Sequence, residues 1–311
     1  MTFKRLSEYF SLLEQNASRL KMTEVLADLF KECRENEIAK IVYLSLGRLL
    51  PQYEGLEFQM AQKMMEKAVA KAFGVEVVKV KKEMGKQGDL GKVGEILKDQ
   101  RSKIIMQNLF GEIGEIRDIG VIKVYDRLME IVKESGEGSV ERKVDKMAAL
   151  LQDLDPLSVR FVIRMPLGKM RLGFSQMTIL DALSWMKTGD KSLRKKLEDA
   201  YNVVSDVGLI AEKVRGIRPA FAKASAGKDI GDIRPKLGVP IIPALCQRLG
   251  TAEEIAEKLG EMAVEPKYDG TRLQIHFSRE SQGKEGEKGR VGTRIFTRNL
   301  ENVTKMFPDI V

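Results

Sequence analysis

The feature that most constrains the fold of this chain is an apolar repeat, at helical spacing, that runs through its N-terminal two thirds. It starts with Phe3, Leu6 and Phe10, and a second helix follows a break at Asn16. This spacing places apolar side chains on one face of an α-helix. No convincing strand alternation occurs before about residue 158. We therefore predict an all-helical domain over residues 1–215.

Glycine, proline and aspartate residues divide this repeat into separate helices. The periodic segments predict helices over residues 3–13, 20–30, 38–50, 56–73, 90–97, 116–133, 140–152, 175–187 and 193–204. Small, polar and unpatterned residues with flanking prolines follow, and we interpret residues 216–238 as a linker that contains an insertion. A further helix is predicted over residues 252–259, ahead of short strands.

Composition limits the class of protein. The chain has 311 residues, 43% of them apolar, which is enough for two domains with real cores. A net charge of +8 favours a polyanionic partner, nucleic acid first, although a merely basic protein remains an alternative. Cys33, Cys246 and the single His276 do not make a zinc site, and two cysteines indicate a reducing interior. No apolar run reaches the length of a membrane span or a secretory signal.

The stretch from Glu265 to Arg272 carries the chemistry of the second part of the chain. Both flanks alternate apolar and polar residues, and Asp269-Gly270 between them is typical of a tight hairpin. We therefore predict strand, turn and strand, with Glu265 and Lys267 on one face because side chains repeat every two residues. A surface hairpin with scattered charges is the alternative interpretation.

The order Lys267-x-Asp269-Gly270-x-Arg272 resembles the nucleotidyl-transfer motif of ATP-dependent DNA ligases and RNA-capping enzymes. Fragments of the helical part resemble the DNA-binding domain of archaeal-type DNA ligases: Glu8-Tyr9-Phe10, Leu46-Gly47-Arg48-Leu49, Glu54-Gly55-Leu56-Glu57 and Lys71-Ala72-Phe73-Gly74. Residues 294–301 resemble the family's second motif, with Thr297 where serine is usual. Capping enzymes do not explain the long helical part, so the resemblance favours the ligases.

The resemblance implies a role for each motif residue. Lys267 would attack the α-phosphate of ATP and form a lysyl-AMP phosphoramidate, with Mg²⁺ neutralising the triphosphate. Glu265 would bind the adenine end, and Arg272 and Arg298 the ribose and phosphates. The AMP would then pass to the 5′-phosphate of a nick in duplex DNA. The metal ligands are not assigned to any residue.

A second candidate site lies in the helical part, from Gly168 to Gly173. Two glycines enclose Lys169 and Arg171 just before a predicted helix, where free N–H groups can meet phosphates. The segment is similar to the Leu-Arg-Ile-Gly type of segment in the ligase family. We therefore predict that Lys169, Arg171 and Gly173 contact the DNA backbone, with an ordinary solvated turn as the alternative.

The resemblance also implies the architecture. Residues 239–311 would be the first part of an adenylation domain built on an ATP-grasp-like antiparallel sheet, and we expect the rest of it and an OB-fold domain to be absent from this chain. We expect a cytoplasmic, nucleoid-associated monomer that serves replication, repair and recombination, and a sliding clamp as a candidate partner. The alternative is a non-catalytic DNA-binding module with a vestigial catalytic segment.

Overall fold

The fold is mostly helical, as the periodicity predicts. The structure, a computed structural model, describes residues 1–108, 118–216, 230, 233–244, 247–278 and 292–311. The first helices are α1 (Phe3–Glu14), α2 (Arg19–Glu32), α3 (Glu35–Ser45), η1 (Gln52–Glu54), α4 (Gln62–Phe73), α5 (Val77–Gln87) and α6 (Leu90–Asn108). They are followed by α7 (Val121–Lys133), α8 (Ser139–Asp153), α9 (Pro156–Arg164), α10 (Gln176–Thr188), α11 (Arg194–Val203) and α12 (Val207–Gly216).

The remaining elements are short. Helix α14 (Ala252–Leu259) precedes strands β1 (Leu273–His276) and β2 (Arg294–Thr297), and η4 (Thr304–Met306) closes the segment. The two strands form an antiparallel sheet in which Leu273 lies opposite Thr297. Within the described residues, the C-terminal segment therefore has a small antiparallel sheet after a helical domain, in agreement with the predicted fold class.

Side chains at helix starts explain several boundaries. Thr2 accepts a hydrogen bond from the backbone N–H of Arg5 at 3.2 Å and so begins α1. Asp155 caps α9 in the same way, through the N–H of Ser158 at 3.1 Å, with a proline in the first turn. The predicted helix over residues 38–50 ends earlier, at Ser45, because Gly47 takes a positive φ of 70°.

Some sequence predictions of helices were wrong or incomplete. Residues 56–61 are not helical, since the backbone turns at Gln59, whose φ is 51°. Helices α5, α9 and α12 were not predicted. Helix α5 buries only Val80, so its sequence lacks a strong apolar repeat. The start of the helix predicted over 116–133 falls partly outside the described residues, and so does most of the predicted linker 216–238.

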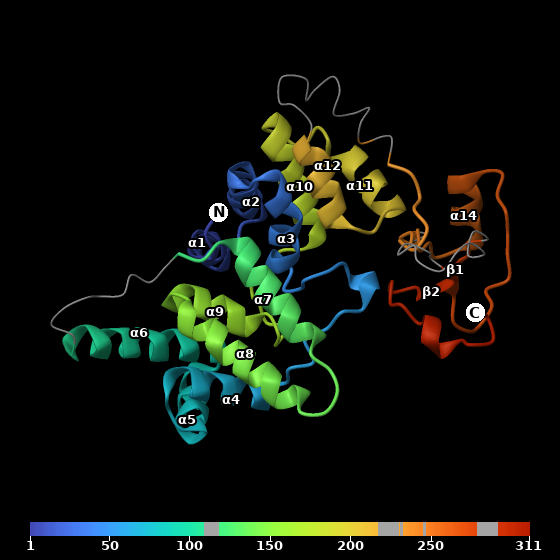
Figure 1. The fold of residues 1–311 in the computed structure, drawn as a ribbon. Helices are drawn as coiled ribbons and strands as arrows, with labels where there is room; N and C mark the ends of the chain where they lie inside the picture. Colours follow the sequence, from blue (N-terminus) through green and yellow to red (C-terminus); the bar gives the residue numbers. More distant parts are fainter. Residues whose placement is uncertain (109–117, 217–229, 231–232, 245–246, 279–291) are drawn as a thin grey trace.

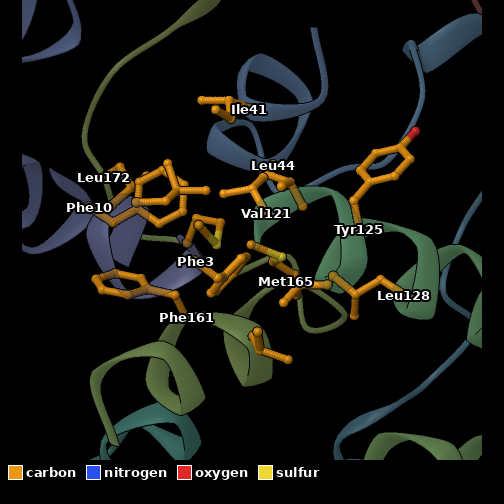
Figure 2. Close-up of a cluster of buried hydrophobic side chains, with 14 of the residues drawn as sticks. Phe3, Phe10, Ile41, Leu44, Val121, Tyr125, Leu128, Phe161, Met165 and Leu172 are labelled. Atoms are coloured by element: carbon orange, nitrogen blue, oxygen red, sulfur yellow. The ribbon is translucent and has the colours of Figure 1, made fainter. Parts of the chain in front are cut away.

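One apolar core joins helices α1 to α12, whose arrangement is shown in Figure 1. Figure 2 shows its centre, where Phe3 and Phe10 of α1 meet Phe161 of α9 and Val121 of α7. The rings of Phe10 and Phe161 lie edge to face, with centroids 5.3 Å apart. The four side chains are completely buried, and each such side chain contributes about 1.5–3 kcal/mol relative to an exposed position.

Helices α6 and α9 approach each other unusually closely. A Cβ atom at Gly91 would lie 2.5 Å from the backbone oxygen of Arg160, and one at Gly94 would lie 2.2 Å from Cδ1 of Ile163. A side chain at Gly91 would force the helices apart because it would meet the backbone, whereas one at Gly94 would require the Ile163 side chain to shift.

Candidate functional site

The lysine stretch does not form the predicted hairpin. Residues 262–272 have no strand, and β1 pairs with β2, not with residues 262–264. Val264 is 86% exposed, so its side chain finds no apolar surface to cover. Pro266 also lacks the N–H group that a continuous ladder would require. The prediction of strand, turn and strand across Asp269-Gly270 is therefore wrong for this structure.

The motif residues remain apart from one another. Glu265, Lys267 and Arg272 are exposed, and within the described residues no hydrogen bond or ion pair joins any of them to another group. An amine, a carboxylate and a guanidinium are chemically suited to a nucleoside triphosphate. However, these three side chains are not enclosed or brought into contact here, so their predicted roles stay predictions.

Arg298 lies in a tight turn just after β2. The hydroxyl of Thr297 accepts hydrogen bonds from the backbone N–H groups of Asn299 and Glu301, both at 3.2 Å. A serine hydroxyl can make the same bonds, which explains why threonine can replace it at this position. The turn leaves the Arg298 side chain exposed to solvent.

The small sheet is anchored on the helical domain through Phe296. Phe296 is completely buried, and its ring lies edge to face against Tyr53 at 6.3 Å and His276 at 5.1 Å. Val204 and Val239 complete this cluster, which we call the Phe296 cluster. Only the apolar residues of β2 indicate this cluster in the sequence, because the partners of Phe296 lie far away along the chain.

Polar groups reinforce this contact. The Arg294 guanidinium donates to the Glu54 carboxylate at 3.2 Å. Nδ1 of His276 accepts a hydrogen bond from the N–H of Gly238 at 3.0 Å. Burial, together with the charge of Arg294, lowers the pKa of His276 below its ordinary value, so the ring is neutral at physiological pH.

A buried carboxylate, that of Asp206, binds the Tyr53 side chain of the Phe296 cluster. Asp206 accepts hydrogen bonds from the hydroxyls of Tyr43 at 2.6 Å and Tyr53 at 3.0 Å. Burial and the negative charge of Asp206 raise the pKa of both tyrosines, which therefore stay protonated and donate. Tyr53 thus connects α3 and the start of α12 to the sheet.

The Gly168–Gly173 segment forms an exposed loop before α10. Met170 and Leu172 are buried, and the intervening Lys169 and Arg171 are exposed. Arg171 has a positive φ of 57°, which is uncommon for a residue with a side chain. The structure therefore presents both predicted cations on the surface, although it does not test their contact with DNA.

Asp89 holds this loop, a role that the sequence did not reveal. Nη1 of Arg171 lies 3.3 Å from Oδ2 of Asp89, and Nη2 donates to the carbonyl of Gly88 at 3.3 Å. Asp89 also binds Arg164, whose side chain is only 1% exposed. The sequence places Asp89 directly before a predicted helix, but it indicates neither the burial of Asp89 nor its partners.

The described residues contain no group of three or more His, Cys, Asp or Glu side chains suited to a metal ion. They also contain no helix that is both long and apolar enough to cross a bilayer.

Comparison with known proteins defines the class. Residues 2–184 match the family model described as DNA ligase N terminus, and residues 243–311 match that of the ATP dependent DNA ligase domain. Fold, lysine motif and these two matches place the chain among the ligase-type nucleotidyltransferases. The first match covers more than half of the chain, which therefore belongs to the ATP-dependent DNA ligase family.

Similar proteins agree along the whole chain. The chain is 39% identical to "Probable DNA ligase" of Dictyoglomus turgidum over 312 residues, which is 100% of this chain and 48% of that protein. It is 38% identical to "DNA ligase 2" of Thermofilum pendens and to "DNA ligase" of Sulfurisphaera tokodaii, covering 100% of this chain and 49% of each relative. The chain thus spans about half the length of the curated relatives that it matches.

Proposed function

We propose that this chain supplies the DNA-binding domain and the attacking lysine of an ATP-dependent ligase that seals nicks in duplex DNA. The observation that carries the proposal is the position of Lys267. It stands in the Lys-x-Asp-Gly-x-Arg order, inside the segment that matches the ATP dependent DNA ligase domain. The matched relatives are named DNA ligases, which supports the same activity.

The proposed reaction has three transfers. Nζ of Lys267 attacks the α-phosphorus of ATP, a P–N bond forms, and the bond to the β-phosphate breaks with release of pyrophosphate. The 5′-phosphate of a nick then takes the AMP from the lysine. Finally the 3′-hydroxyl attacks this activated phosphate, closes the strand and releases AMP. Arg272 and Arg298 would hold phosphates by charge-assisted hydrogen bonds, and Glu265 the adenine end.

The metal ion, the DNA contacts and the partners are also part of this proposal. Mg²⁺ would arrive with the triphosphate, which is its usual carrier into such sites. Lys169, Arg171 and Gly173 would contact the DNA backbone. The protein would work as a monomer on the nucleoid, for which its net charge of +8 is suited, and a sliding clamp would be a further partner.

A chimera tests the proposal. Residues 1–311 are fused to the C-terminal half of the Dictyoglomus turgidum relative, beginning where the match to this chain ends. We expect labelled AMP to remain on the chimera after denaturation, and nicked duplex to be sealed. The same chimera with Lys267→Ala should lose both. Label retained on that variant would mean that another residue is the nucleophile.

The second candidate function is a non-catalytic DNA-binding module. The exposure of Lys267 is the observation that favours it, since an attacking lysine needs an enclosed pocket to lose its proton. A chimera that binds nicked DNA but takes up no AMP would support this alternative.

A further inference from the structure

Arg48 is a half-buried arginine without a partner. It follows the end of α3, directly after Gly47, and within the described residues no hydrogen bond or ion pair reaches its guanidinium. Every other buried or half-buried arginine of the described chain has an acceptor, as Arg127 has in Asp153 and Arg194 in Asp181. Burial lowers the pKa of Arg48, which reflects the unfavourable desolvation of an unpaired cation.

Three surface grooves meet at this arginine. One is lined by Gly47, Leu56 and Met64, and another by Pro51, Glu57 and Glu301. The third lies between Arg48 and the Gly168–Gly173 loop, and we call it the Arg48 groove. Carboxylates line the first two grooves through Glu57 and Glu301. The lining of the Arg48 groove contains two arginines, Arg48 and Arg171, and no Asp or Glu.

Packing fixes the arginine beside the loop. A Cβ at Gly47 would lie 2.9 Å from Cγ of Met170, so the chain before Arg48 and the loop are in direct contact. Met170 is buried by this contact. The backbone segments that carry the two arginines of the groove are therefore packed directly against each other.

The two arginines differ in how far their charge is already neutralised. Arg171 lies 3.3 Å from the Asp89 carboxylate. Arg48 has no described carboxylate within ion-pair distance. A guanidinium held without a partner can give its full set of donors to an incoming anion, and phosphate matches its planar fork.

We propose that the Arg48 groove binds a backbone phosphate of duplex DNA, with Arg48 as the principal contact. The inference rests on the proposed DNA-binding function and deepens it by naming its strongest contact. Duplex DNA suits the groove because the groove is open to solvent and is lined by the exposed cation Arg171. Exposed Lys169 lies two residues away on the same loop, so a chain of phosphates would meet several cations here.

The test compares three single variants of the 311-residue chain, each losing one positive charge: Arg48→Gln, Arg171→Gln and Lys133→Gln. Lys133 is exposed at the end of α7 and lines none of the three grooves. Binding to a fluorescent nicked duplex and to the same duplex without the nick is measured at several salt concentrations. Circular dichroism checks that each variant is folded.

We expect Arg48→Gln to weaken binding to both duplexes about tenfold or more and to reduce the salt slope by about one. Arg171→Gln should have a smaller effect, and Lys133→Gln should bind like the unmodified chain. If the unmodified chain binds DNA and Arg48→Gln matches Lys133→Gln, the Arg48 inference is wrong while the proposed function survives. If the unmodified chain binds no DNA, both fall.

A second measurement does not depend on the variant folding. The unmodified chain is treated with phenylglyoxal, with and without duplex DNA, and modified arginines are located by mass spectrometry. DNA should slow the modification of Arg48 several-fold and leave that of Arg142 unchanged. Equal rates at Arg48 with and without DNA, under conditions where the chain is bound, would overturn the inference.

Discussion

The Arg164 guanidinium donates to the Asp89 carboxylate in the interior of the helical domain, with 2.6 Å between Nη2 and Oδ2. The two side chains are only 1% and 4% exposed. Asp89 also accepts from the N–H of Gly91 at 2.9 Å, and its Oδ2 lies 3.3 Å from the Arg171 guanidinium. One buried carboxylate therefore links α6, α9 and the loop that carries Lys169 and Arg171.

Removing the charge of Asp89 should be costly. Asp89→Asn leaves Arg164 buried with an incompletely compensated charge, and breaking one side of a buried ion pair costs about 3–5 kcal/mol. We expect the free energy of unfolding in urea to fall by about this amount. Asp99→Asn, at an exposed position of α6 that pairs only with Lys103, should cost less than about 1 kcal/mol.

The same pair predicts a pH dependence. Burial raises the pKa of Asp89, but the hydrogen bonds and charge of Arg164 outweigh it, and the net pKa lies below the ordinary value. A carboxyl group whose pKa is lowered on folding stabilises the fold above its unfolded pKa of about 3.9. That stability should be lost as the pH falls through the lower folded pKa. Urea unfolding between pH 6 and pH 3 should show a flatter acid limb for Asp89→Asn than for the unmodified chain.

The exposed loop should contribute to DNA binding without regard to sequence. Lys169→Ala combined with Arg171→Ala removes two cations, so binding should weaken for every duplex and the salt slope should fall by up to about two. Lys195→Ala with Lys196→Ala, on α11, is the control with the same loss of charge. A salt titration in which both double variants behave alike would remove the loop from the DNA-binding surface.

The Phe296 cluster should hold the C-terminal segment on the helical domain. Phe296 is completely buried, and replacing such a side chain by alanine costs about 3–5 kcal/mol. We expect Phe296→Ala to speed amide exchange in residues 292–311 while the helices keep their protection. Phe277→Ala is the matched control, because Phe277 is 62% exposed. Unchanged exchange in Phe296→Ala would mean that the sheet is held elsewhere.

The 311-residue chain by itself should form little or no lysyl-AMP. Lys267 is exposed, and no described group holds it in line with the phosphate. Orientation alone can supply about 7–11 kcal/mol of the reduction in the barrier. Incubation with labelled ATP and Mg²⁺, followed by denaturation, measures the bound label. Stoichiometric labelling would show that the lysine is activated within this chain.

The helices that could be predicted from sequence are those with a broad apolar face. Helices α1, α8 and α10 lie within two residues of their predicted bounds, because periodicity and end signals agree there. Helix α5 was not predicted, since Val80 is its only fully buried residue. Helix α5 packs against α4 and α6, and these contacts cannot be predicted from the pattern of its own residues.

The family was predictable from the sequence and the geometry around Lys267 was not, while the roles of the individual motif residues stay predictions. The order of residues around Lys267 identified the motif, because such an order is specific whatever the fold around it. The hairpin prediction failed, since a strand forms only beside a partner and Val264 has none here. The Arg48 groove and the Phe296 cluster depend on residues far apart in sequence, which periodicity cannot connect.

The close approach of α6 and α9 also limits which residues can replace the glycines at their contact. Gly91 meets the backbone of Arg160, which cannot move aside as a side chain can. A library that randomises Gly91 and is selected for folded protein should therefore return glycine at this position, because every other residue would place a Cβ atom against that backbone. We therefore expect this helix contact to tolerate very few substitutions.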